Sequence, residues 1–120
     1  MATTPSTQPP LSVHVTIRVS PTNAPRFLEL LRPCQEGCLS EPQCLYFDVF
    51  HDGHGLFRFV EVWTLTRAEF ESVQMRKPYY EPYLSLTTPM WTQDRDIQYF
   101  EQVPGWLGVR GAYFEGRVRT

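Results

Sequence analysis

The amino-acid sequence predicts an α+β fold in which two helices cover one face of an antiparallel four-stranded sheet. Four segments have the alternation or the aromatic, β-branched composition typical of strands, and two segments between them have the apolar spacing of amphipathic helices. Their order is strand, helix, strand, strand, helix, strand, which folds as a ferredoxin-like βαββαβ sheet.

The first strand and the first helix follow from simple periodicities. Residues 11–19 alternate, with Val13 and Val15 on one face and His14 and Thr16 on the other. Apolar residues then recur at helical spacing, which predicts a helix over residues 24–39.

A hairpin and a second helix come next. The runs CLYFDVFH and LFRFVEVW are joined by DGHG, where Gly53 and Gly55 supply the positive φ angles of a tight loop. Thr66 and Glu69 have the spacing of a capping box, which predicts a helix to about residue 77. Two prolines then favour a separate helical turn, and residues 96–103 alternate as the last strand.

The length of the chain fits one domain. A sequence of 120 residues with 42% hydrophobic content is too short for two ordinary cores. We expect residues 1–10, rich in Thr, Ser and Pro, to be a disordered tail, residues 11–103 to form the domain, and residues 104–120 to be a C-terminal extension that adds an edge strand or a partner contact.

Charge and composition exclude several classes of partner. The net charge of -2 comes from scattered residues and leaves no basic stripe for nucleic acid or anionic lipid. No apolar stretch is long enough to span a bilayer, and an odd number of cysteines does not fit a secreted disulfide framework. We expect a cytoplasmic protein with a small organic ligand and no contact with nucleic acid or membranes.

The histidines and cysteines do not predict a metal site. His51 and His54 flank a tight turn that directs their rings apart, and the three cysteines have spacings of four and six residues, unlike a zinc knuckle. Nor does the chain contain a glycine-rich nucleotide loop. We therefore expect no metal and no cofactor.

The second face of the sheet predicts self-association. Residues 45–50 and 56–62 are apolar or aromatic on both faces, which would expose more apolar surface than a monomer normally shows. A homodimer formed through the sheets covers that surface.

Four stretches of the sequence are characteristic in their order and spacing: VHVTIRVSP, SEPQCLYFDVF, FVEVW and KPYY. In these stretches the chain resembles the antibiotic biosynthesis monooxygenase family of the dimeric α+β barrel superfamily. The resemblance covers about residues 11–103. It implies a dimeric barrel with a pocket between sheet and helices. Such families include cofactor-free oxygenases of phenolic polyketides and quinols, heme-degrading enzymes, and polyketide cyclases.

The resemblance also implies a set of site residues. Positions that surround the substrate in the heme-degrading branch match His14, Trp63 and Gln74. Because Gln74 replaces an imidazole ligand, heme degradation by that arrangement is not expected. Phe59 replaces an asparagine found in many oxygenase members, and Tyr79 replaces a histidine.

The candidate roles follow from side-chain chemistry. As catalytic residues we select His14 as a base near neutral pH, Gln74 to orient a carbonyl, and Tyr79 as a phenolic donor. The expected substrate-binding residues are Thr16, Phe59, Trp63 and Tyr80. Each has an ordinary alternative: a hydrogen-bonded strand histidine, or aromatic residues that only pack.

Glu61 shares a face with Phe59 and Trp63, and we expect it to pair with Arg58 or a lysine rather than act as a base.

Together these features predict a cofactor-independent oxygenase of secondary metabolism that acts on an aromatic or polyketide-like substrate. A base forms a carbanion, which then reacts with dioxygen. Two alternatives stay open: a polyketide cyclase or isomerase that uses the same pocket without oxygen, and a non-catalytic dimer that binds a hydrophobic ligand.

Overall fold

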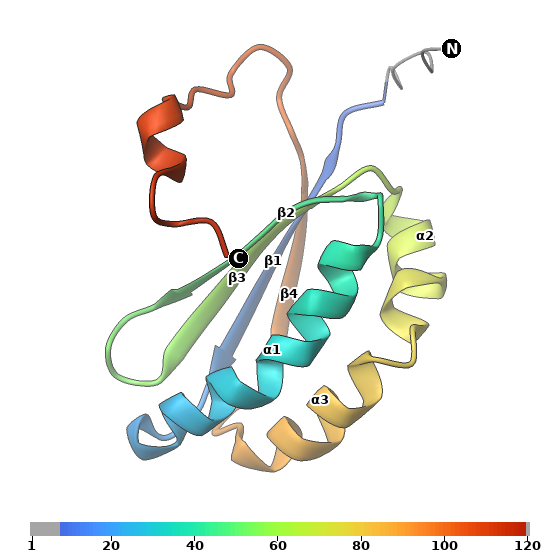
Figure 1. Ribbon diagram of the computed structural model, residues 1–120. Helices are drawn as coiled ribbons and strands as arrows, with labels where there is room; N and C mark the ends of the chain where they lie inside the picture. The colour runs from blue at the N-terminus through green and yellow to red at the C-terminus, as the bar shows by residue number, and fades with distance from the viewer. Residues whose placement is uncertain (1–7, 120) are drawn as a thin grey trace.

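The computed structural model describes residues 8–119, so most of the predicted N-terminal tail lies outside the described residues. The elements are β1 (Leu11–Arg18), α1 (Ala24–Ser40), β2 (Cys44–His51), β3 (Leu56–Trp63), α2 (Arg67–Ser72), α3 (Tyr80–Thr87) and β4 (Asp96–Glu101). Their order confirms the predicted ferredoxin-like arrangement, and α3 is the separate helical segment expected after the two prolines, whereas α2 ends earlier than predicted (Figure 1).

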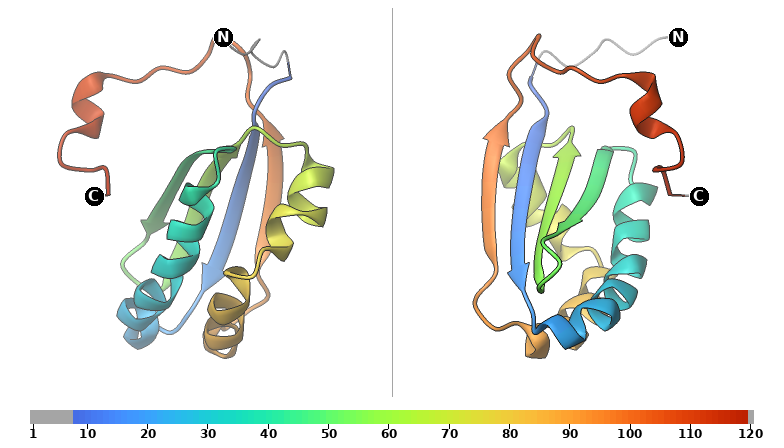
Figure 2. Two further views of the ribbon diagram at one scale, coloured as in Figure 1. Left: turned by 45° about the vertical axis from the view of Figure 1, so that its right-hand side comes forward. Right: turned by 90° about the vertical axis from the view of Figure 1, so that its left-hand side faces the viewer.

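The four strands form one antiparallel sheet in the order β2-β3-β1-β4. All three α-helices lie on the same face of this sheet, as Figures 1 and 2 show. The sheet therefore has a covered face, which packs on the helices, and a bare face, which has no helix against it.

The second helix ends earlier than predicted, and a 3-10 helix takes its last turn. Thr66 and Glu69 form the expected capping box at the start of α2. The helix ends at Ser72, and a 3-10 helix, η2 (Gln74–Arg76), follows. Lys77 is extended, as residues before a proline commonly are, and this resets the chain direction before α3.

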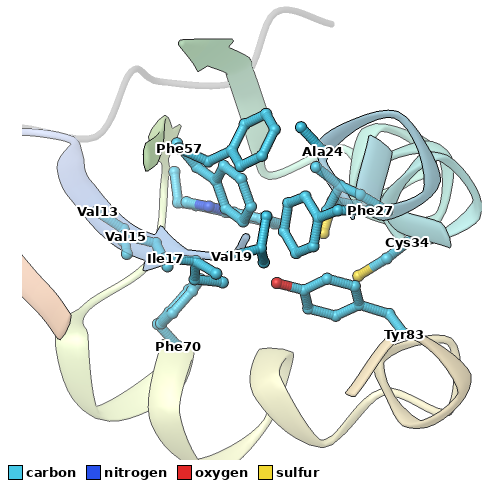
Figure 3. Close-up of a cluster of buried hydrophobic side chains, with 14 of the residues drawn as sticks. Val13, Val15, Ile17, Val19, Ala24, Phe27, Cys34, Phe57, Phe70 and Tyr83 are labelled. Carbon is cyan, nitrogen blue, oxygen red and sulfur yellow. The ribbon is translucent and has the colours of Figure 1, made fainter. Parts of the chain in front are cut away.

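The core lies between the helices and the covered face of the sheet, with Phe70 of α2 and Tyr83 of α3 in the same cluster as the residues of α1 (Figure 3). The ring of Phe27 stacks on that of Phe57 at 4.8 Å between centroids, and Trp63 meets the edge of Phe70 at 5.6 Å. Alternate residues of β1 complete the layer, because every second side chain of a strand points to the same face.

The β2/β3 loop is fixed by one glycine. Gly55 has φ +99°, and a Cβ atom there would lie 2.1 Å from the carbonyl oxygen of Val19. The Val19 amide donates a 2.9 Å hydrogen bond to the Gly55 carbonyl, which ties the loop to the end of β1. Only glycine fits this close approach.

The C-terminal extension, residues 104–119 of the described chain, forms no strand. After β4 it runs to the β2 side of the molecule, where it contains the 3-10 helix Gly111–Phe114 (Figure 2). Arg119 pairs with Glu36 of α1 at 3.4 Å, while Trp106 stays 82% exposed.

Across residues 8–119, none of the helices has the length and apolar character required to cross a membrane.

Candidate active site

A small cavity lies on the covered face, between the sheet and the helices. Its volume of about 30 Å³ holds a group the size of one water molecule. Most of the lining is apolar or aromatic, but it also includes a carboxyl group, a guanidinium and two phenols. The lining residues are Val15, Leu31, Cys34, Phe47, Phe59, Glu61, Phe70, Met75, Tyr80, Tyr83, Arg95 and Ile97.

Glu61 supplies the carboxyl group of this cavity. It lies on β3 directly opposite Val13 of β1, so strand alternation turns it toward the core, where it is 4% exposed. The Trp63 indole Nε1–H donates a 3.0 Å hydrogen bond to Oε1 of Glu61. Since Arg58 points to the bare face, the ion pair expected for Glu61 is absent among the described residues, and this expectation was wrong.

Burial governs the protonation of Glu61. Removal of the carboxylate from water raises the pKa of Glu61 to about 7, although the hydrogen bond from Trp63 and the charge of Arg95 act in the opposite direction. A carboxyl group with this pKa can take up and release a proton near neutral pH, which is the property required of a general base.

A hydrogen-bonded network holds one of the phenols in the wall of the cavity. The Gln74 amide Nε2 donates to the hydroxyl of Tyr79 at 2.7 Å and to that of Tyr80 at 3.2 Å. The Tyr79 hydroxyl donates to Glu41, and the Tyr80 hydroxyl lies 3.1 Å from Sγ of Cys38. Burial is the main cause that raises the pKa of both tyrosines above the usual value, so they stay protonated at neutral pH and do not serve as bases.

The seven residues predicted for the site separate into four groups. Phe59 and Tyr80 line the cavity. Gln74 and Tyr79 lie behind Tyr80 and orient it through hydrogen bonds. Trp63 is fully buried and does not line the cavity; its expected stacking on a substrate is replaced by its hydrogen bond to Glu61.

His14 and Thr16 form the fourth group and require a correction. They alternate with the buried valines of β1, so both side chains point to the bare face, across the sheet from the cavity. His14 lies 2.9 Å from the hydroxyl of Ser12 and packs against the ring of Phe100. Partial burial, followed by the charge of Arg58, lowers the pKa of His14. The sheet separates this imidazole from any substrate held under the helices.

His51 and His54 make their contacts within the β2/β3 hairpin. The His51 ring stacks on Phe57 at 4.2 Å and accepts a 3.0 Å hydrogen bond from the Gly55 amide. His54 is exposed at the tip, where its amide donates to the Asp52 carboxylate. Within residues 8–119 these histidines belong to no cluster of three or more potential metal ligands.

A larger hollow of about 730 Å³ lies between α1, β2 and the C-terminal extension. Leu31 and Phe47 line both this hollow and the small cavity, so they separate the two. Its three arginines have partners: Arg117 donates to backbone carbonyls of the extension, Arg32 to Gln35, and Arg119 pairs with Glu36. Neither Glu61 nor the Tyr80 network reaches it, and we assign the chemistry to the smaller cavity.

No sequence pattern indicated Tyr83 or Arg95, and Glu61 was considered but not selected as a base. A signal existed for Glu61, because a carboxylate alternated onto a face otherwise made of Phe57, Phe59 and Trp63. Arg95 follows an irregular loop, and no periodicity places it near the cavity.

The comparisons agree with this architecture. Residues 10–72, more than half of the chain, match the family model described as antibiotic biosynthesis monooxygenase. A protein of Pestalotiopsis microspora with the name "Putative monooxygenase GME11364" is 30% identical over 99 residues, which cover 81% of this chain and 82% of that protein.

Solved structures share the fold. A crystal structure described as an antibiotic biosynthesis monooxygenase is 27% identical, with a TM-score of 0.69 over 78% of this chain and 99% of that one. A protein from Pseudomonas aeruginosa is 22% identical, with a TM-score of 0.68 over 82% of this chain and 99% of its own. The family match and the 30% identity show that this chain belongs to the antibiotic biosynthesis monooxygenase family.

Proposed function

We propose that the protein is a cofactor-independent oxygenase of secondary metabolism that acts on an aromatic or polyketide-like substrate, with Glu61 as the base. The observation that carries this proposal is a carboxyl group with a pKa of about 7 in an apolar cavity. Family membership supports the reaction class, because the matching model and the Pestalotiopsis microspora relative are both described as monooxygenases.

The reaction begins with a proton transfer. The Glu61 carboxylate removes a proton from a CH2 group that two aryl or carbonyl groups activate. The carbanion passes one electron to dioxygen, and the resulting radical pair combines into a carbon-bound peroxide anion, which takes the proton back from Glu61. Loss of the second C–H proton and cleavage of the O–O bond give a ketone and water, so one dioxygen is consumed for each CH2 group oxidised.

The surroundings of Glu61 suit this sequence of steps. Apolar and aromatic side chains exclude water from the carbanion and the peroxide. The Tyr80 phenol, held by Gln74, donates a hydrogen bond to the oxygen on which charge develops. Because the carbanion itself reduces dioxygen, the reaction needs no bound nucleotide or metal.

A substrate larger than the cavity requires movement at its mouth. The cavity admits one small group, which fits dioxygen or the reacting edge of a ring. Met75 is half-buried in the lining, and its unbranched side chain changes rotamer at low cost. The ring system therefore enters where Met75 swings aside.

We also propose that two copies pack through their bare faces. Phe50 and Phe100 are each about half exposed there, at 47% and 49%, and Val60 and Val62 lie between them. Large apolar side chains exposed on a face without a helix are typical of an interface.

Oxygen consumption tests the proposed reaction. With anthrone as substrate, we expect uptake of one dioxygen per anthraquinone formed and incorporation of one atom from 18O2 into the product. Product formation under strict anaerobiosis contradicts oxygenation and indicates a cyclase or isomerase. Thermal stabilisation by anthrone without any product indicates a binding protein.

A further inference from the structure

Arg95 is a cation in the lining of the cavity, and within the described residues it makes no ion pair. It lies between η3 (Thr88–Met90) and β4, it is half-buried, and it lines the same space as Glu61. Its nearest aromatic contact is the Trp91 ring at 5.6 Å. A half-buried guanidinium with unused donors is suited to a planar anion.

Below pH 7 the groups around Arg95 leave its charge largely uncompensated. Glu61 is held largely protonated below neutral pH by its burial, and Tyr83 and Tyr99, which also face this charge, are phenols. Asp94 and Asp96 flank it in sequence, but both are exposed and neither lies within ion-pair distance.

A second polar group of the cavity is also unused. The Tyr83 hydroxyl is buried, and within the described residues it meets the hydrogen-bond limits with no partner, although the Thr87 hydroxyl of the same helix lies beside it. Figure 3 shows the Tyr83 ring reaching from α3 into the buried cluster. Buried donors without a partner are rare in folded proteins and call for an explanation.

We propose that Arg95 determines specificity by binding an anionic oxygen of the substrate, a carboxylate or an acidic phenolate on a planar aromatic ring. This inference rests on the proposed function for the identity of the cavity, and it adds the substrate class. Arg95 anchors the anion and so directs the opposite edge of the ring toward Glu61. The five N–H donors of arginine match a carboxylate in two-point contact, whereas lysine offers only a point charge.

A matched ligand pair tests the proposal by calorimetry. The probes are 2-naphthoate and its neutral isostere 2-naphthamide, measured at pH 6, where Glu61 is largely protonated. We expect the wild type to bind the naphthoate about tenfold more tightly than the amide, the difference that one charged hydrogen-bonded contact supplies.

Variants assign that preference to a residue. Arg95→Gln is expected to weaken naphthoate binding about tenfold and to leave naphthamide binding within about twofold, while Arg95→Lys keeps part of the preference. Arg110→Gln removes the same charge from an exposed position of the C-terminal extension and serves as the control, with no expected change. Equal effects of the two glutamine variants, or no preference or no binding in the wild type, overturn the proposal.

The test is independent of catalysis. Loss of naphthoate preference in Arg95→Gln, with oxygen uptake unaffected by Glu61→Gln, would keep the anion site and remove the proposed base. The reverse result would remove the anion site and keep the base.

Discussion

The two titratable residues that suggest base catalysis lie on opposite faces of the sheet, and their pKa values are shifted in opposite directions. Glu61 lies on the covered face, under the helices, and His14 lies on the bare face. Loss of solvent disfavours the charged form of each, so the pKa of Glu61 rises and that of His14 falls. Only Glu61 combines a pKa near 7 with a cavity beside it.

Residue type alone is therefore a poor guide to catalysis when two candidate residues lie on opposite faces of a sheet. Histidine has the more suitable pKa in water, but strand alternation places His14 away from the helices. Glutamate is unsuitable in water and becomes suitable through burial beside Trp63.

The largest expected effect is a loss of activity when Glu61 on the covered face is replaced, but not when His14 on the bare face is replaced. Glu61→Gln removes the base and should lower kcat/KM for anthrone oxidation by roughly 100- to 10,000-fold. His14→Ala should leave the rate within about twofold, because its side chain lies across the sheet. Steady-state oxygen uptake measures both, and a large loss in His14→Ala with little loss in Glu61→Gln would reverse the assignment.

A charge on the bare face tests the proposed dimer. Val60 lies at the centre of that face, opposite His14, so Val60→Glu should place an unpaired carboxylate in the interface and weaken association at least about a hundredfold. Light scattering at micromolar concentration should report a monomer. Leu86→Glu, at an exposed position of α3, is the control and should stay dimeric. A monomeric wild type contradicts the proposed packing.

Protonation of Glu61 should also appear in stability. The unfolded chain releases this proton near pH 4.5, the ordinary pKa of a glutamate, whereas the folded chain holds it up to about pH 7. The free energy of unfolding therefore falls with rising pH across this window, by about 3 kcal/mol. Glu61→Gln should lack this contribution, so urea unfolding at pH 4 and pH 8 should show the variant gaining about 3 kcal/mol relative to the wild type at the higher pH. A constant difference would argue against a raised pKa.

The smallest effect concerns Trp63. Trp63→Phe removes the indole donor that stabilises the carboxylate, so the pKa of Glu61 should rise further, by about one unit. The pH dependence of kcat/KM should shift upward by the same amount, with its shape kept. An unchanged profile combined with a lower plateau would indicate that Trp63 acts through packing alone.

Much of the fold follows from the sequence. The alternation of β1, the DGHG loop and the Thr66 capping box each have a local physical cause, and all appear in the structure. The end of α2 at Ser72, rather than near residue 77, was not predicted. Tyr79 packs over Gly37 of α1, where a Cβ atom would lie 2.5 Å from the ring, and no local pattern reveals such a contact.

The site could be predicted from the sequence less completely than the fold. Alternation already placed Glu61 on the face of Phe59, but its pKa depends on how completely the helices exclude water. The Gln74 network needs η2 and α3 to meet α1 at specific positions, and Arg95 reaches the cavity from an irregular loop. Such three-dimensional placements leave no periodic trace in the sequence.

The most direct test of this account is the titration of the Glu61 carboxyl group itself. An infrared difference spectrum between the wild type and Glu61→Gln isolates its C=O stretch from those of the other carboxyl groups. The account predicts loss of the protonated band with a midpoint near pH 7. A midpoint near 4.5, the ordinary value, would contradict the assignment of Glu61 as the base.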